Sequence, residues 1–398
     1  MSYTGDNHTL ASLTVTVARD REAIESLRDA WEQFQEHPNA DLDLYSAACS
    51  TGSEDVHPYV VLVSRDTRPQ AILIGLIQPF DFPITLGYTT FFSIKLRSLT
   101  VFPGAVQGKV SEEVARKFMD TLLDSCNGHE IDLVRLIDIP ADSALASLAM
   151  RRPSWLCRDH VRWSGEHWKI DLPDSMDAFY RRMQEKHRRP LRKACRLIER
   201  ENPDGLSYAV FTRPEDVDRF CEEAEYIAGR TYQQRIGASF VKTDEAVRKL
   251  RLLAARGQWR AYVLYVRGAP AAYWVGTRYR STFYLDHTGR DPAHSRLNPG
   301  VGTILFAKMI EDLCSATDVR NVDFGFGDYP YKRRFGTRSE PTVTLYIFAP
   351  TILGVSLNIL RTVLAFVERG IARLLQFLGV RSRVKRLWRE RLGRQGSS

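Results

Sequence analysis

The sequence of 398 residues lacks the usual signatures of metal binding, disulfide bonding and membrane insertion. Its six cysteines are scattered and include no Cys-x-x-Cys pair, so neither a zinc site nor a disulfide framework is expected. The nine histidines show no ligand spacing, and the sequence therefore predicts no metal. No run of 18 or more uncharged apolar residues occurs, which argues against an ordinary membrane span. Residues 1–20 resemble no signal peptide, so we expect a reducing, cytoplasmic setting.

Positive charge is concentrated in two segments of the chain. Residues 181–200 carry nine Lys/Arg and two Glu, and residues 351–398 carry ten Lys/Arg and two Glu. Because the whole chain has a net charge of +8, the remainder is mildly acidic. A protein that coats nucleic acid with its whole surface does not have this distribution, and we expect no DNA partner.

One order of predicted strands and helices occurs twice along the chain. Apolar periodicity predicts a mixed α/β layer in residues 1–165 and a second layer of the same order in residues 166–348. We therefore expect an α/β (mixed α+β) fold built from two copies of one domain type, followed by a tail at residues 349–398. Residues 175–201 are predicted to form a long basic helix that Pro190 interrupts.

The most distinctive stretch, residues 323–336, reads Asp-Phe-Gly-Phe-Gly-Asp-Tyr-Pro-Tyr-Lys-Arg-Arg-Phe-Gly and follows a predicted strand. Its three glycines permit a positive φ or a close backbone approach. Two interpretations stay open, a functional site and a tight β-hairpin with a solvated basic tip. Asp323 fits a buried carboxylate paired with a cation, or a general base. As a site, the stretch offers Asp323, Asp328 and Tyr331 for acid–base chemistry, and Tyr329, Lys332 and Arg333 for binding an acceptor or anion.

Residues 299–303, Pro-Gly-Val-Gly-Thr, lie between a predicted strand and a predicted helix. Small residues at a helix N-terminus let backbone N–H groups approach an anion, which the helix dipole also favours. A plain helix start with glycines for close packing explains the same pattern. Upstream, Asp286 and His287 end a strand, where they suit either a general base or a turn. The residues expected to hold a phosphate-bearing cofactor are Arg290, Asn298, Gly300, Val301, Gly302 and Thr303.

The two basic segments also have alternative interpretations. In the first, cations at positions 188, 189, 192 and 193 share a broad helix face, which fits an anionic polymer, phospholipid or RNA, or simply a solvated face. In the second, residues 358–378 have the periodicity of an amphipathic helix, and a basic segment follows from residue 381. This pattern fits an anionic inner membrane leaflet or docking onto protein.

The motif Asp-Phe-Gly-x-Gly-Asp-x-x-Tyr-Lys-x-x-Phe-Gly, with Asn-Pro-Gly upstream at 298–300, resembles a bacterial branch of the GNAT acyltransferase superfamily. That branch is often labelled as cellulose- or exopolysaccharide-biosynthesis-associated acetyltransferase. It is similar to the Fem-type aminoacyltransferases, which carry two GNAT domains in tandem. The resemblance covers roughly residues 165–348 and, more weakly, residues 1–165. It implies tandem GNAT-like domains with a degenerate first copy, and acyl-CoA bound with its pyrophosphate near residues 300–303.

The resemblance also implies a reaction. An acyl group such as acetyl would pass to a sugar, lipid-linked or amine acceptor, with Asp323 or Asp328 deprotonating the acceptor and Tyr331 protonating the leaving thiolate. Fem-type relatives take their donor from aminoacyl-tRNA instead, and a non-catalytic scaffold of polysaccharide synthesis is a third hypothesis. We expect a cytoplasmic protein whose residues 351–398 either bind the inner face of the membrane or dock onto protein.

Overall fold

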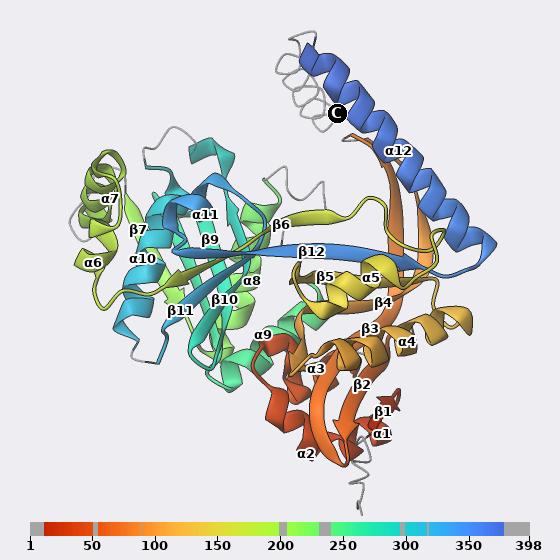
Figure 1. Ribbon diagram of the computed structural model, residues 1–398. Coiled ribbons are helices and arrows are strands. Elements are labelled where there is room, and N and C mark those ends of the chain that lie inside the picture. The colour runs from red at the N-terminus through yellow and green to blue at the C-terminus, as the bar shows by residue number, and fades with distance from the viewer. Residues whose placement is uncertain are drawn as a thin grey trace, which may run out of the picture. The chain divides into compact units, whose positions relative to one another are not determined.

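The computed structural model describes residues 12–50, 55–87, 89–198, 205–230, 240–294, 299–316 and 318–377. The chain divides into two compact units, one of Met1–Ser164 with Pro341–Ser398 and one of Gly165–Glu340. Each unit contains a sheet with helices packed on it (Figure 1). This mixed α+β architecture confirms the fold class that the sequence predicts.

The first unit has six strands in its sheet. Its elements are β1 (Leu13–Ala18), α1 (Arg21–Ser26), α2 (Arg28–Trp31), η1 (Glu32–Phe34), η2 (Pro38–Ala40), α3 (Leu42–Cys49), β2 (His57–Arg65), β3 (Arg68–Leu86), β4 (Thr89–Gly108), α4 (Glu112–Asn127), β5 (Leu133–Pro140), α5 (Ala144–Arg151), most of β12 (Arg338–Phe348) and α12 (Ile352–Phe377). The strands lie in the order β1-β2-β3-β4-β5-β12. Neighbouring strands are antiparallel except β4 and β5, which are parallel.

The second unit repeats this plan. Its elements are β6 (Trp163–Asp171), α6 (Met176–Arg181), α7 (Glu185–Ile198), β7 (Leu206–Phe211), η3 (Pro214–Asp216), α8 (Val217–Ala228), α9 (Asp244–Ala255), β8 (Trp259–Val266), β9 (Ala269–Tyr279), β10 (Thr282–Arg290), η5 (Pro292–His294), α10 (Val301–Ser315), β11 (Asn321–Phe326) and α11 (Pro330–Phe335). The strands lie in the order β7-β8-β9-β10-β11-β6. Again all neighbours are antiparallel except one pair, β10 and β11.

In each sheet, five strands follow one another along the chain, and the sixth comes from another part of the sequence. β6 follows the first five strands in sequence but pairs with β11, and β12 follows α11 but pairs with β5 from Thr342 to Phe348. The sequence places residues 166–348 together as the second copy. In the structure the second unit ends at Glu340, because the backbone groups of the remaining residues of β12 pair with β5.

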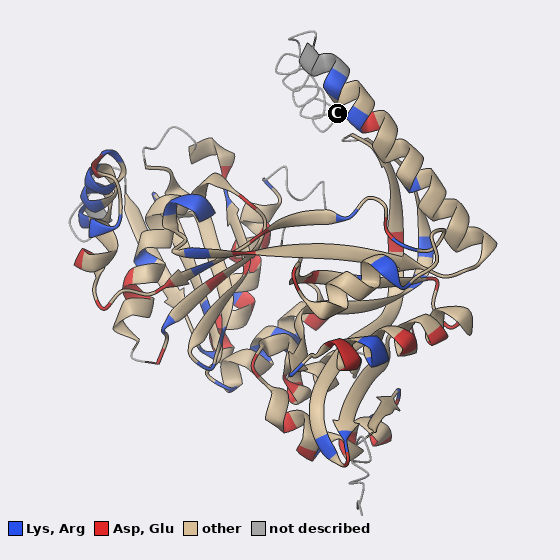
Figure 2. Ribbon diagram, in the orientation of Figure 1, with Lys and Arg blue, Asp and Glu red and all other residues tan. Residues whose placement is uncertain are grey.

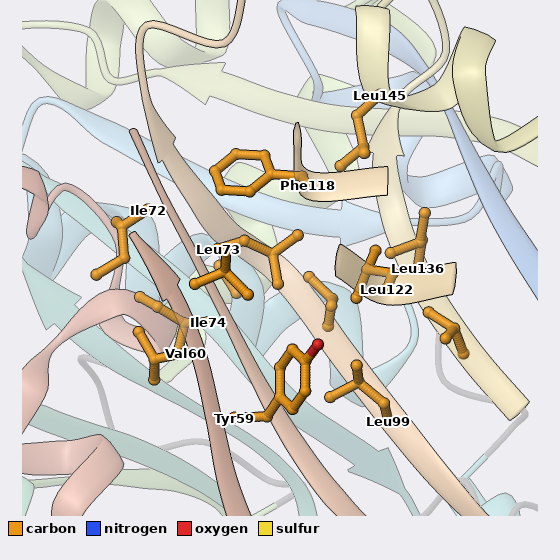
Figure 3. Close-up of a cluster of buried hydrophobic side chains, with 14 of the residues drawn as sticks. Tyr59, Val60, Ile72, Leu73, Ile74, Leu99, Phe118, Leu122, Leu136 and Leu145 are labelled. Carbon is orange, nitrogen blue, oxygen red and sulfur yellow. The ribbon is translucent and has the colours of Figure 1, made fainter. Parts of the chain in front are cut away.

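Each unit has its own apolar core. In the first, side chains from β2, β3, β4 and α4 meet, among them Tyr59, Ile72, Leu99 and Phe118 (Figure 3). In the second, residues 261–265 of β8 are all buried, and since alternate side chains point to opposite faces, both faces of this sheet are covered. α10 packs on β8 and β9, and α8 also packs on both strands.

The long basic helix has its interruption at a different place from the one predicted. Pro190 lies inside α7, and the break falls at residues 182–184, between α6 and α7. A proline inside a helix removes one backbone hydrogen bond. Burial of Leu191 and Ala194 in the core of the second unit outweighs that loss, because most helix stability in proteins comes from tertiary packing.

Candidate functional site

β10 and β11 pair over only three residues before they separate. Their parallel register runs from Thr282 opposite Asn321 to Tyr284 opposite Asp323. β10 then has a bulge between Leu285 and His287 and continues along β9, while β11 continues along β6 to Phe326. The predicted acid–base residues on these strands therefore lie where the two parallel strands diverge.

Asp323 is buried at this point and is held by a histidine on β6. The Nε2–H of His167 donates to Oδ1 of Asp323 at 2.7 Å, and the backbone N–H of Gly325 donates to the same oxygen at 2.7 Å. Burial alone would raise the pKa of Asp323, but these hydrogen bonds, the charge of His167 and that of Lys169 bring the pKa below its ordinary value. Asp323 is therefore a buried carboxylate paired with His167, which becomes a cation when it is protonated. This is one of the two roles that the sequence left open.

The chain beyond Asp323 is neither a plain strand nor a hairpin. Gly325 and Gly327 have φ values of +67° and +106°, which turn the chain from β11 toward α11. Gly336 has an ordinary φ of −62°, but a Cβ there would lie 2.4 Å from Cε3 of Trp168. The sequence prediction that these glycines serve positive φ or close approach is thus confirmed, and the β-hairpin interpretation is wrong.

Lys332 fastens α11 to the end of β11. Its ammonium group is buried and donates to the carbonyl oxygens of Phe324, Gly325 and Phe326 at 2.7, 2.9 and 2.7 Å. An ammonium group has three N–H donors, so these three contacts match its capacity. Such contacts support a role in shaping the site rather than in holding a substrate directly.

Asp328, Tyr329 and Arg333 face outward, whereas Tyr331 is half-buried. Arg333 donates through two nitrogens to both carboxylate oxygens of Asp328, and this pairing holds the pKa of Asp328 below its ordinary value. Tyr329 is 57% exposed and stacks on Tyr331 with ring centroids 6.0 Å apart. Burial raises the pKa of Tyr331 to about 12, so its phenol keeps its proton through the neutral range.

Asp286 and His287 occupy the bulge on β10. The Oγ1–H of Thr277 donates to Oδ2 of Asp286 at 2.8 Å, and the ring of His287 meets Phe240 edge to face. His287 is exposed as a residue. The protein atoms around its ring still displace water and thereby lower its pKa, and the charge of Asp286 partly offsets this effect. Both residues lie on β10 just beyond its last residue that pairs with β11, which is where the two strands separate.

The N-terminus of α10 follows β10 and is open. Gly300 is the N-cap residue, no side chain among the described residues caps the helix, and its first turn contains no acidic residue. Among the described residues, a Cβ built on Gly302 would come within 4 Å of Cδ of Arg290 alone, at 3.9 Å. Trp274 of β9 holds this helix start by donating from Nε1 to the carbonyl of Gly302 at 3.2 Å. Val301 is buried beneath the turn, whereas Thr303 is half-buried, and Asn298 lies outside the described residues.

The matching helix of the first unit has the opposite character. α4 follows β4 as α10 follows β10, but Ser111 caps it by accepting from the N–H of Val114 at 3.3 Å. Glu112 and Glu113 stand in its first turn. Two carboxylates and an occupied cap disfavour an anion at that helix end. The two equivalent helix starts thus differ in cap and charge, and that of α10 favours an anion more than that of α4 does.

Sequence reasoning missed His167 and Trp274. Both lie on strands far in sequence from the groups they contact, and no local pattern indicates such pairings. Among the residues that the structure describes, no group of three or more His, Cys, Asp or Glu could hold a metal ion.

Residues 185–333 match the family model described as an acetyltransferase (GNAT) domain. No curated protein matches the chain. Among solved structures, FemX is similar in fold, with 12% sequence identity over 84% of this chain and 97% of that chain and a TM-score of 0.50.

Two further solved structures resemble the chain. One is the C-terminal domain of a putative lysylphosphatidylglycerol synthetase from Agrobacterium fabrum, with 15% identity over 86% of this chain and 96% of that chain and a TM-score of 0.49. The other is a tandem GNAT protein from the clavulanic acid biosynthesis pathway, with 14% identity over 85% and 99% of the two chains and a TM-score of 0.49. The family match spans the diverging strands, the open start of α10 and most of α11. Residues 185–333 thus match a GNAT acetyltransferase domain, and the chain is an acyltransferase.

Proposed function

We propose that this acyltransferase transfers an acyl group from acyl-CoA to an amine or hydroxyl of an envelope- or exopolysaccharide-related acceptor. The acyl group that we propose is acetyl. The observation that carries the proposal is the difference between the two equivalent helix starts. α10 has an open, acid-free N-terminus beside the strand divergence, whereas α4 is capped and acidic. Because acyl-CoA is an intracellular metabolite, we place the reaction in the cytoplasm.

The donor's pyrophosphate would lie against the first turn of α10. Backbone N–H groups of residues 301–303 and the helix dipole favour negative charge at this position. Gly302 leaves room for a close approach, and Arg290, whose Cδ borders that glycine, supplies a cation. The thioester would then extend along the end of β10, where a GNAT-type fold separates its two parallel strands.

The reaction needs one base and one acid. The acceptor nitrogen or oxygen attacks the thioester carbonyl, the new bond to carbon forms, and the carbon–sulfur bond breaks. The proton of the acceptor passes to the pair of His167 and Asp323 or, through water, to Asp286 or His287. The phenol of Tyr331 gives its proton to the leaving thiolate, and backbone N–H groups at the strand end stabilise the oxyanion.

The acceptor would contact the exposed side of α11. Tyr329 offers a broad exposed ring, and Arg333 and Asp328 together offer hydrogen-bond donors and acceptors at the surface. Aromatic rings and charged hydrogen-bonding groups are typical of sites that bind sugars. This surface supports a sugar-containing acceptor and the assignment of Tyr329 and Arg333 to its binding.

Isothermal titration of the full chain with acetyl-CoA and with coenzyme A tests the donor. We expect saturable binding that Thr303→Glu weakens by at least about tenfold, since the new carboxylate would repel the pyrophosphate at a helix start. Glu112→Gln in α4 is the matched control and should leave binding unchanged. Absence of binding at millimolar ligand, or equal binding by the Thr303 variant, would refute the proposal.

A second candidate function takes its donor from aminoacyl-tRNA. α7 presents Lys186, Arg189, Lys193 and Arg196 on one exposed stripe, as the cluster of blue on that helix in Figure 2 shows. Arg192, by contrast, pairs with Asp177. Binding of aminoacyl-tRNA should then fall steeply with salt and should fall when Arg189 and Lys193 are replaced by Gln. Salt-independent behaviour, or an unaffected double variant, rules this candidate out.

A further inference from the structure

α12 lies on the first unit with its polar side inward. Asn358 is only 1% exposed, and its amide donates to the carbonyls of Leu156 and Arg158, each at 2.9 Å. Arg361 donates to Oδ1 of the buried Asp159 at 2.6 Å and to the carbonyl of Val161 at 2.8 Å. The polar face of this predicted amphipathic helix therefore attaches the first half of the helix to its own chain.

The apolar side of α12 consequently faces outward. Val363 and Phe366 are 52% and 63% exposed, and further apolar residues at helical spacing share this surface. The exposed apolar residues of α12 are Ile352, Leu353, Ile359, Leu360, Val363, Phe366, Val367 and Ile371. A surface helix normally turns its apolar stripe to the core, so this reversed orientation indicates that something other than water covers it.

The β3–β4 hairpin adds to this apolar surface. Phe82 and Ile84 of β3 form one buried cluster with Leu357, so the outer part of the hairpin runs along the helix (Figure 1). Near its tip, Phe92 is 52% exposed. It lies opposite Ile84 in the register and on the same strand face as Ile94, which also packs against that cluster.

Cations follow the apolar stripe along the chain. Arg369 and Arg373 are exposed in the second half of α12 beside the exposed Glu368, and Figure 2 shows blue and red bands on this part of the helix. In the sequence beyond the described residues, 378–398 contains seven Lys/Arg, one Glu, and also Leu387 and Trp388. An apolar stripe continued by cations matches the acyl chains and the anionic headgroups of a bilayer surface.

We propose that the outward face of α12 and the tip of the β3–β4 hairpin dock the protein on an anionic membrane surface. No helix among the described residues is long and apolar enough to cross a membrane, so this contact lies at the interface. A second copy of the chain is a poorer occupant, because it carries the same cations beside its own apolar stripe, whereas an anionic lipid surface offers the opposite charge. The contact is independent of which donor the enzyme uses.

Co-flotation of the full chain with vesicles tests this surface. We expect binding to vesicles of phosphatidylcholine with about 30% phosphatidylglycerol, weaker binding to phosphatidylcholine alone, and release by salt because screening weakens charge attraction. The test variant is Val363→Gln with Phe366→Gln and Ile371→Gln, three exposed positions where glutamine keeps the helix. Losing three partly inserted apolar side chains should weaken vesicle binding by about 100-fold.

The matched control replaces exposed apolar residues of the second unit, Tyr226→Gln with Val241→Gln, and should bind as the wild type does. Acetyl-CoA titration of the test variant, which should be unchanged, separates this surface from the catalytic site. Equal vesicle binding by the test variant and the wild type would overturn the proposal. So would a wild-type dimer that the test variant converts to monomer without any vesicle binding, since a second copy would then be the occupant.

Discussion

Replacement of Lys332 by methionine distinguishes a structural lysine from a substrate-binding one. Methionine retains much of the apolar stem but removes the ammonium group that donates to three carbonyl oxygens at 2.7 to 2.9 Å. Each buried carbonyl that loses its donor costs about 1 kcal/mol, so the expected loss is about 3 kcal/mol of unfolding free energy. For a unit of this size that corresponds to a fall in Tm of about 6–12 °C.

The assay is urea and thermal unfolding of the full chain, followed by circular dichroism, beside steady-state kinetics. We expect kcat to fall as well, because the same contacts hold the backbone that turns at Gly325 and Gly327. Arg333→Met is the matched control from the same helix. Its exposed pair with Asp328 is expected to contribute little to stability, because water screens the two charges. A K332M enzyme with unchanged stability and only a raised KM for the acceptor would refute the structural role and restore the substrate-binding prediction made from sequence.

Substitutions at Asp323, at two glycines and at two tyrosines each have a distinct expected effect on stability or on kcat. Asp323 has a folded pKa below its ordinary value, so its stabilising contribution is present above about pH 4 and is lost as the pH falls through the folded pKa. Asp323→Asn should therefore cost about 1–3 kcal/mol in urea unfolding at pH 7 and progressively less toward pH 3, whereas a pH-independent penalty would contradict this account. The new Cβ of Gly325→Ala would meet no atom of the described residues within 4 Å, so this change should cost only about 1 kcal/mol for its positive φ. Gly336→Ala should cost more, because its Cβ would collide with Trp168 and with the carbonyl of Lys332. A higher Tm for Gly336→Ala than for Gly325→Ala in thermal unfolding would contradict this packing. Tyr331→Phe should lower kcat by about 100-fold at unchanged KM while Tyr329→Phe keeps kcat, and full activity of Y331F would exclude Tyr331 as the acid.

The sequence by itself determined the features that depend on short stretches of chain. Glycine spacing in residues 323–336 indicated where the backbone turns, since φ is a property of single residues. Periodicity indicated the repeated order of strands and helices and the amphipathic helix in the tail. Pro-Gly-Val-Gly-Thr at 299–303 indicated an open helix start, because a cap depends only on the residues at the helix end.

Only the tertiary structure decided which groups meet. Asp323 and His167 are 156 residues apart in sequence, and their contact depends on β6 pairing with β11 in one register. The same holds for Lys332, which sequence alone placed among substrate-binding groups and which the fold turns onto three carbonyls. Periodicity showed that α12 has two faces, but contacts with the buried side chain of Asp159 and with nearby carbonyl groups turn the polar face inward. Contacts of this kind depend on strand order and register between distant segments, which no local pattern specifies.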